Sequence, residues 1–204
     1  MGTALYKIKE KAKLALFDIK DILDDMGIEF VLLQGTLLGA IRENDFIDTD
    51  EDMDLGARIY DVAPRVKELV SRLHDKGFGT KLVSLSYKFT KDIKIFRNSV
   101  RTDLVTYDFY NNKMFRSLRK WDKIKVYDRK FIDNLKEIDF LGKQFKVFSD
   151  AEEWLEIEYG AHWIKREHRS GKFTTAMVSG YWEDIILKNK GIDYGKNIED
   201  ILKI

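Results

Sequence analysis

The feature that most constrains the fold is an apolar run that leads, across a glycine, into a strictly alternating acidic segment. Residues 28–34, IEFVLLQ, have the length and composition of a buried strand, and Gly35 follows at once. Residues 52–58, DMDLGAR, alternate, so in a strand the carboxylates of Asp52 and Asp54 point to one face and the apolar side chains to the other. The sequence therefore predicts two carboxylates lying side by side on a sheet with a buried back.

Two adjacent carboxylates repel each other, and a packed domain tolerates them when a cation lies between them. Oxygen ligands favour Mg²⁺, with Mn²⁺ as a substitute. The Gly35-Thr36 step, between a strand and a helix, offers backbone N–H groups and a hydroxyl to a phosphate. Asp103, in the strand-like RTDLVTYDFY, is the candidate for a third carboxylate. Together these residues predict a metal and phosphate site.

An acidic run has simpler interpretations, of which a solvated loop is the commonest. We expect this of the acids outside the pair, namely Asp45, Asp48, Asp50 and Glu51. An EF-hand calcium loop is a poor match, because Met53 stands at its required glycine and Ile59 at its bidentate glutamate.

The rest of the chain predicts an α+β fold. Helical periodicity covers residues 4–26, ending at Gly27, and residues 61–76, with Asp61 as cap, Pro64 in the first turn and Gly77 as stop. Strand-like composition covers residues 78–110 and a hairpin around residues 141–143. Ser149 and Glu152 form a capping box for a helix ending at Tyr159, and residues 181–188 are expected to form a last helix. We expect a single domain over residues 1–204, with a core at about 28–110 and a C-terminal hairpin and helices at about 111–204.

Composition limits the class of protein. The formal net charge of +1 gives no global attraction to nucleic acid, so no nucleic-acid partner is expected. The absence of cysteine excludes disulfides, thiolate zinc sites and a cysteine nucleophile. No apolar run approaches the roughly 20 residues of a membrane span, so the sequence predicts no span and a cytoplasmic location.

The run LLQGTLLGAIRENDFIDTDEDMDLG resembles the LicD and fukutin-related branch of the polymerase-β-like nucleotidyltransferases. That family has a GTLLGA(I/V)R stretch, an aromatic-Ile-Pro-Trp step and then Asp-Asp-Asp-hydrophobic-Asp. The likeness continues in TDLVTYDF, where the family has a later strand aspartate, and in FLGKQFKVFSDAEEWLEIEYGAHW, which is similar to its C-terminal signature. It covers about residues 30–163.

The resemblance implies a nucleotidyltransferase fold, a mixed sheet with flanking helices and a helical C-terminal part. It also implies a Mg²⁺-dependent transfer of a phospho-alcohol, such as phosphocholine, glycerol phosphate or ribitol phosphate, from a CDP-linked donor to a hydroxyl of a glycan or lipid-linked sugar. Two alternatives stay open: transfer of a nucleoside monophosphate from an NTP donor with release of pyrophosphate, and a catalytically inactive nucleotide-binding regulatory protein. Retention of the three expected carboxylates argues against the inactive form.

The family's functional positions are carried over where the motif matches. Asp52 and Asp54 match its metal-binding pair, and Asp103 matches its third carboxylate, so these three are the candidate catalytic and metal-binding residues. Gly35 and Thr36 match its phosphate-contacting step.

Candidate cations for substrate phosphate lie elsewhere in the chain. Arg42 matches the family arginine, Lys88 and Lys94 lie on strands leading towards Asp103, and Arg166 belongs to the basic loop at residues 165–172. For Lys88, Lys94 and the loop, solvation is the alternative. The chain departs from the family at Glu43, where a His is usual, at Asp48-Thr49, where Pro-Trp is usual, and at Glu51.

Overall fold

A mixed sheet forms the centre of the protein in a computed structural model that describes residues 4–84, 91–118, 123–165 and 185–186. The 8-stranded sheet has the order β1-β2-β5-β6-β7-β10, and β4, followed by β3, pairs with β5 as well. The strands are β1 Phe30–Leu32, β2 Met53–Arg58, β3 Gly79–Ser84, β4 Lys91–Arg97, β5 Val100–Tyr110, β6 Lys113–Leu118, β7 Lys123–Asp128 and β10 Ile185–Ile186. Strands β2 and β5 pair in parallel, whereas the other neighbours are antiparallel. The expected α+β class with a mixed sheet is confirmed.

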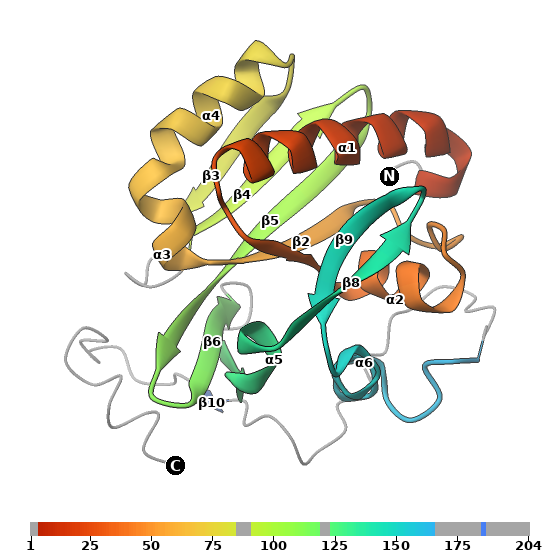
Figure 1. The fold of residues 1–204 in the computed structure, drawn as a ribbon, viewed down its shortest axis with the longest axis vertical. Coiled ribbons are helices and arrows are strands. Elements are labelled where there is room, and N and C mark those ends of the chain that lie inside the picture. The colour runs from red at the N-terminus through yellow and green to blue at the C-terminus, as the bar shows by residue number, and fades with distance from the viewer. Residues whose placement is uncertain (1–3, 85–90, 119–122, 166–184, 187–204) are drawn as a thin grey trace.

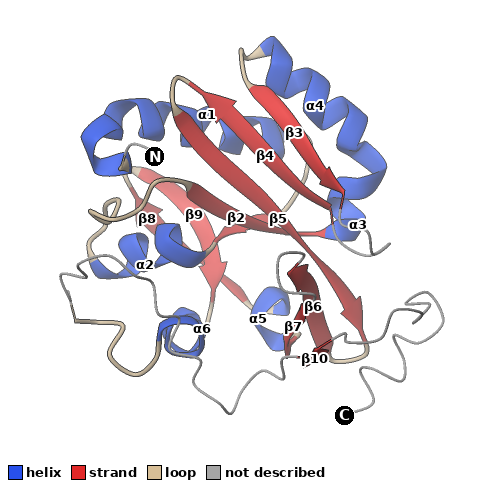
Figure 2. Cartoon of the chain, turned by 180° about the vertical axis from the view of Figure 1, so that it is seen from behind, coloured by secondary structure: helices blue, strands red, loops and turns tan. Residues whose placement is uncertain are grey.

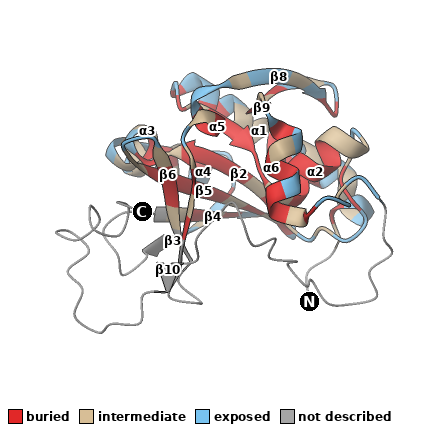
Figure 3. Cartoon of the chain, turned by 90° about the horizontal axis from the view of Figure 1, so that it is seen from below, coloured by how far each residue is buried: buried red, intermediate tan, exposed pale blue. Residues whose placement is uncertain are grey.

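Helices and a small hairpin surround this sheet. The helical segments are η1 Leu5–Ile8, α1 Lys9–Asp25, α2 Gln34–Arg42, α3 Ile59–Val62, η2 Ala63–Arg65, α4 Val66–Asp75, α5 Lys130–Asp133 and α6 Ala151–Tyr159. Strands β8 Leu135–Phe140 and β9 Lys143–Phe148 form a separate 2-stranded sheet, as the Leu-Gly hairpin predicted. In Figure 3, β8 lies along the outside of the molecule, and half of its residues are exposed.

Helices α1 and α4 cover one face of the strands β3, β4 and β5 (Figure 1), and Figure 2 looks onto the other face of these strands. The covered face holds the core because α1 is apolar at helical spacing and the strands are apolar at every second position. Fully or almost fully buried side chains there are Ala12, Leu16, Ile19, Leu23, Leu69, Leu73, Ile93, Ile95 and Leu104. The alternate residues of β4 and β5 therefore face away from α1 and α4.

Several local expectations were wrong. The predicted helix at residues 61–76 begins earlier, at Ile59, and is interrupted by a 3₁₀ turn that contains Pro64, because proline has no N–H to continue the ladder. Asp61 lies inside α3 and does not cap it. Asp150, not Ser149, is the N-cap residue of α6, and it makes no side-chain capping bond, so the predicted capping box does not form.

The sheet also extends past residue 110, where the sequence predicted no further strand before the hairpin. Asn111 adopts a positive φ of 51° in the turn that joins β5 to β6, and β7 then pairs with β6. Of the expected last helix at residues 181–188, only Ile185 and Ile186 are described, and they pair with β7 as a short strand instead. The remainder of that expected helix lies outside the described residues.

Candidate active site

The three predicted carboxylates come together where β2 and β5 run side by side. Parallel pairing places Asp54 directly opposite Asp103, and Asp52 lies one residue before β2 begins. One carboxylate oxygen from each of the three residues lies within 4.8 Å of the others. All three residues are mostly but not fully buried, so a ligand can still reach the cluster.

The start of α2 is fastened to this acidic strand. The Asp54 N–H donates to Thr36 Oγ1 at 2.9 Å, and the Leu33 N–H donates to the Asp54 carbonyl oxygen at 2.9 Å. Thr36 is fully buried, so in this structure its hydroxyl faces the backbone of Asp54 and holds that residue in place. The first N–H groups of α2 have no intrahelical acceptor and give this end of the helix partial positive charge.

Gly35 leaves room for a fourth carboxylate that the sequence analysis expected in solvent. A Cβ added to Gly35 would overlap Asp50 Oδ2 and lie 2.7 Å from Asp50 Cγ. Burial raises the pKa of Asp50 from 3.8 to about 7, and Arg101 partly opposes that rise. Asp50 Oδ2 is buried and has no hydrogen-bond partner in the described part of the chain. Asp50 corresponds to the first aspartate of the family's Asp-Asp-Asp run. This match is the sequence feature that could have predicted a place for Asp50 at the site.

Asp54 carries the most strongly perturbed carboxyl of the site. Burial raises its pKa from 3.8 to about 8, the nearby acids Asp50 and Asp103 add to the rise, and Arg116 opposes it. Near neutral pH this carboxyl therefore holds its proton until a cation or a base approaches.

Basic side chains balance the other two carboxylates. Lys94 lies on β4, directly across from Asp103 of β5. Its Nζ is 3.2 Å from Asp103 Oδ2, so Lys94 reaches the acid cluster. Arg101 contacts Asp52 through Nη2, and its Nε lies 3.2 Å from Asp103 Oδ1. Arg101 was not among the residues predicted for the site, although its spacing of two residues from Asp103 places both on one face of β5.

The predicted substrate residue Arg42 lies at the far end of α2. It is seven residues beyond Gly35, about 10 Å along the helix at 1.5 Å per residue. Its Nη2 lies 2.5 Å from Glu43 Oε1, and its Nη1 donates to the Trp163 carbonyl oxygen at 3.3 Å. Glu43, which stands where the family usually has a His, thus pairs with this arginine. Lys88 and Arg166 lie outside the described residues.

A second set of polar residues continues from the acids along the same face of the sheet. Arg116, on β6, influences the pKa of Asp54, Asp92 and Tyr107, which shows that these side chains lie close together. Farther along, Glu158 of α6 accepts hydrogen bonds from Lys125 at 2.9 Å and from Tyr127 at 2.7 Å. The acid cluster is therefore the end of a longer polar face.

Helix α6 also brings an aromatic hydroxyl near the acids. The pKa of Tyr159 lies well above its ordinary value, first because the side chain is buried and then because Asp50 and Asp54 are close. Tyr159 also packs, partly buried, against the hydrophobic core, so it contacts the core and lies near the acidic site.

The three-carboxylate cluster fits a hard divalent cation. Its donors are all oxygens, as Mg²⁺ and Mn²⁺ prefer. Asp103 Oδ1 is buried and accepts no hydrogen bond among the described residues, so the fold supplies this oxygen with no N–H or O–H donor that a cation would have to replace. The nearby guanidinium of Arg101 shows that the cluster already attracts positive charge.

Comparisons with known proteins identify the family. The model of the LicD/FKTN/FKRP nucleotidyltransferase domain family matches residues 27–150. The chain belongs to this family. The matched segment includes β1, α2, β2, β5 and all three carboxylates, so the family membership and the acid cluster concern the same part of the fold.

Individual relatives add little about activity. The chain is 28% identical over 137 residues to the "Uncharacterized protein RT0683" of Rickettsia typhi, covering 60% of this chain and 44% of that protein. The chain thus spans less than half the length of this curated relative. Among solved structures, it is similar to a "putative nucleotidyltransferase (TM1012)" from Thermotoga maritima, with a TM-score of 0.46 and 13% identity over 71% of this chain and 81% of the other.

Across the described ranges, no helix is both long enough and apolar enough to cross a membrane.

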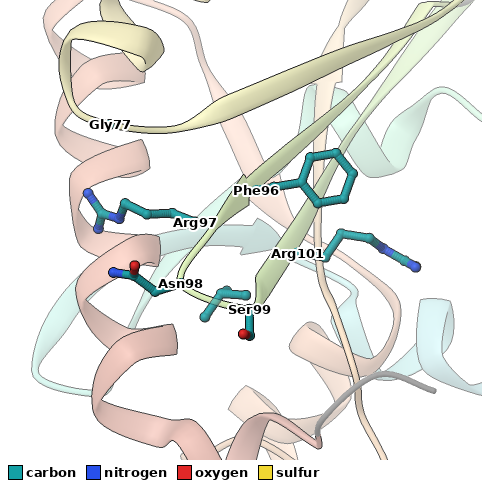
Figure 4. A pocket seen from close by; sticks show the side chains of 7 residues that line it. Gly77, Phe96, Arg97, Asn98, Ser99 and Arg101 are labelled. Carbon is teal, nitrogen blue, oxygen red and sulfur yellow. The ribbon is translucent and has the colours of Figure 1, made fainter.

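A hollow of about 350 Å³ lies at the β4–β5 turn. In Figure 4, Arg97 and Arg101 project from this hollow in opposite directions. Arg97 pairs with Asp18 of α1 at 2.6 Å on the helix-covered face, whereas Arg101 reaches the acids.

Proposed function

We propose that this member of the LicD/FKTN/FKRP family is a divalent-cation-dependent phosphotransferase. It moves a phospho-alcohol group, such as phosphocholine, glycerol phosphate or ribitol phosphate, from a CDP-linked donor to a hydroxyl of a glycan or lipid-linked sugar. The observation that carries the proposal is the cluster of Asp52, Asp54 and Asp103, whose oxygens lie within 4.8 Å of one another in the matched family segment.

Each residue has a distinct part in the proposed reaction. Asp52, Asp54 and Asp103 would hold Mg²⁺, or Mn²⁺ in its place, and the ion would supply positive charge to the phosphoryl oxygens. Thr36 and the start of α2 fix the backbone of Asp54, and the first turn of α2 offers N–H groups to a donor phosphate. Lys94, held beside Asp103, adds a further positive charge.

The bond changes follow an in-line displacement. The acceptor hydroxyl oxygen forms a bond to the phosphorus of the phospho-alcohol, and the bond from that phosphorus to the CMP oxygen breaks. The hydroxyl proton passes to a carboxylate, for which Asp103 is the candidate, and CMP leaves with the electron pair of the broken bond. A neutral Asp54 would reduce the negative charge that repels the donor, whereas its ionised form would hold the cation.

Thermal-shift measurements with candidate donors test this proposal first. CDP-choline, CDP-glycerol and CDP-ribitol, each with and without Mg²⁺, should raise the melting temperature more than ATP or CTP, since preferential binding to the native state stabilises it. The donor that binds best is then incubated with sugar acceptors, and phosphorus nuclear magnetic resonance identifies the product.

Variants distinguish the specific role of the three-carboxylate cluster from the nonspecific effect of removing any nearby negative charge. Asp52→Asn and Asp54→Asn should abolish the Mg²⁺-dependent shift and turnover, whereas Asp48→Asn, in the exposed part of the preceding loop, should retain both. Release of pyrophosphate from an NTP would establish the nucleoside monophosphate alternative. Turnover that survives in both the Asp52 and Asp54 variants would show that the catalytic site lies elsewhere.

A further inference from the structure

The guanidinium of Arg101 lies among the residues predicted to bind a cation. Its Nη2 contacts Asp52 Oδ2, and its Nε is 3.2 Å from Asp103 Oδ1. The same two residues contribute oxygens to the three-carboxylate cluster. Since Arg101 precedes Asp103 by two residues on β5, the strand itself directs the guanidinium to this face. One positive group therefore already lies where a divalent cation would bind.

This arrangement is only partly satisfied by hydrogen bonds. Arg101 Nε and Asp103 Oδ1 are both buried, and neither makes a well-directed hydrogen bond within the described residues, despite lying 3.2 Å apart. The Arg101 side chain is 43% exposed, against 19% for Asp52 and 17% for Asp103. The acids are thus fixed in the fold, while the arginine approaches them from the solvent side and has space to withdraw.

We propose that Arg101 is an internal counter-ion that a divalent cation displaces, and that the released guanidinium then binds a phosphate of the substrate. Arg101 contacts Asp52 and Asp103, two of the three residues of the cluster, so a divalent cation bound there competes with the guanidinium for the same carboxylates and repels it. A planar guanidinium binds phosphate through two parallel hydrogen bonds, and its anchor on β5 keeps it beside the cluster after it leaves the acids.

The phosphate part of this inference rests on the proposed function, but the displacement part does not. It depends only on the shared carboxylates. Lys94 does not take the same role, because its contact is with the other oxygen of Asp103, Oδ2, and it does not reach Asp52 in the structure.

Binding of Mn²⁺ to the full chain, measured by electron paramagnetic resonance at pH 8.5 without nucleotide, tests the displacement. Arg101→Gln removes a competing cation and should tighten Mn²⁺ binding by about twofold to thirtyfold, the range expected for two partly exposed Arg–carboxylate contacts. Arg101→Lys keeps the charge and should remain nearer the unsubstituted protein. Arg72→Gln is the matched control, because the Arg72 side chain is also 43% exposed but pairs with Glu68 on α4.

Binding of pyrophosphate in saturating Mn²⁺, measured by calorimetry, tests the second part. Arg101→Gln should weaken it by at least fivefold, opposite in direction to its effect on the ion, and a merely structural role would not produce opposite changes. Unchanged or weaker Mn²⁺ binding in Arg101→Gln would overturn the displacement, and unchanged pyrophosphate binding would overturn the phosphate contact. Failure of the proposed function would look different, as normal Mn²⁺ effects with no turnover of any CDP-linked donor.

Discussion

Replacing Asp54 by asparagine should make the metal-free protein more stable while removing its ability to bind a cation. The pKa of Asp54 is about 8 in the folded protein and 3.8 is its ordinary value, so at pH 7 the carboxyl is protonated when folded and ionised when unfolded. Ionisation over this gap of about 3 pH units stabilises the unfolded chain by about 4 kcal/mol, at roughly 1.36 kcal/mol per unit. Asparagine cannot ionise, so the variant loses this penalty.

Part of the gain is offset because the new amide brings donors that need partners. An unsatisfied buried donor costs about 1–3 kcal/mol, which leaves a net stabilisation of about 1–3 kcal/mol. Urea unfolding in EDTA at pH 7 should show this as a midpoint about 0.5–1.5 M higher than that of the unsubstituted protein, for a slope near 2 kcal/mol/M.

Asp103→Asn is the contrasting variant. Asp103 is held by Lys94 and Arg101, so its neutralisation removes two favourable contacts and should lower stability by about 0.4–2 kcal/mol. Both variants should lose Mn²⁺ binding. A lower urea midpoint for Asp54→Asn in EDTA would refute the reasoning, since it would show that the buried carboxyl stabilises the fold.

Three other outcomes follow. Because the pKa values of Asp50 and Asp54 are raised to about 7 and about 8, the stability that they contribute is complete below pH 4 and is lost as pH rises through 8. Melting temperatures in EDTA should therefore fall from pH 5.5 to 8.5, and Mg²⁺ should reverse the fall; a rise with pH would contradict this. Glu158→Gln should cost about 1–3 kcal/mol in urea unfolding, because it replaces the charged acceptor of Lys125 and Tyr127 by a neutral amide; an unchanged or higher midpoint would contradict it. Gly35→Ala should cost about 1–3 kcal/mol, because the new Cβ would overlap the Asp50 carboxylate that packs against Gly35; an unchanged urea midpoint would contradict this.

The acidic strand could be predicted because its information is local. The alternation at residues 52–58 identifies a strand and the face on which its acids lie, and the observed β2, Met53–Arg58, differs by one residue at its start. The glycine-threonine step likewise follows a short buried strand and begins a helix, as α2 shows. These features depend on neighbouring residues only.

Other parts of the site depend on contacts between distant segments, which a single sequence does not specify. Asp50 lies in an irregular loop with no periodicity, and its burial arises only when that loop packs on Gly35. Arg101 meets Asp52 only because β5 pairs in parallel with β2, and no local pattern fixes that register. The missed strands β6 and β7 carry charged residues on a face that α6 covers, as in the contact of Lys125 with Glu158. A buried charge pair does not have the apolar alternation that identifies a strand.

The site accommodates its negative charge in two different ways, and both bear on cation binding. Burial raises the pKa of Asp50 to about 7 and that of Asp54 to about 8, so both carboxyls are less ionised near neutral pH than exposed acids, whereas Asp52 and Asp103 lie beside the positive charge of Arg101, with Lys94 also at Asp103. A divalent cation held by Asp52, Asp54 and Asp103 would replace both kinds of neutralisation, because Asp54 would lose its proton and, as proposed above, Arg101 would be displaced. Loading should therefore release a proton as well as a guanidinium, which gives metal affinity a dependence on pH that a site made only of exposed acids would lack.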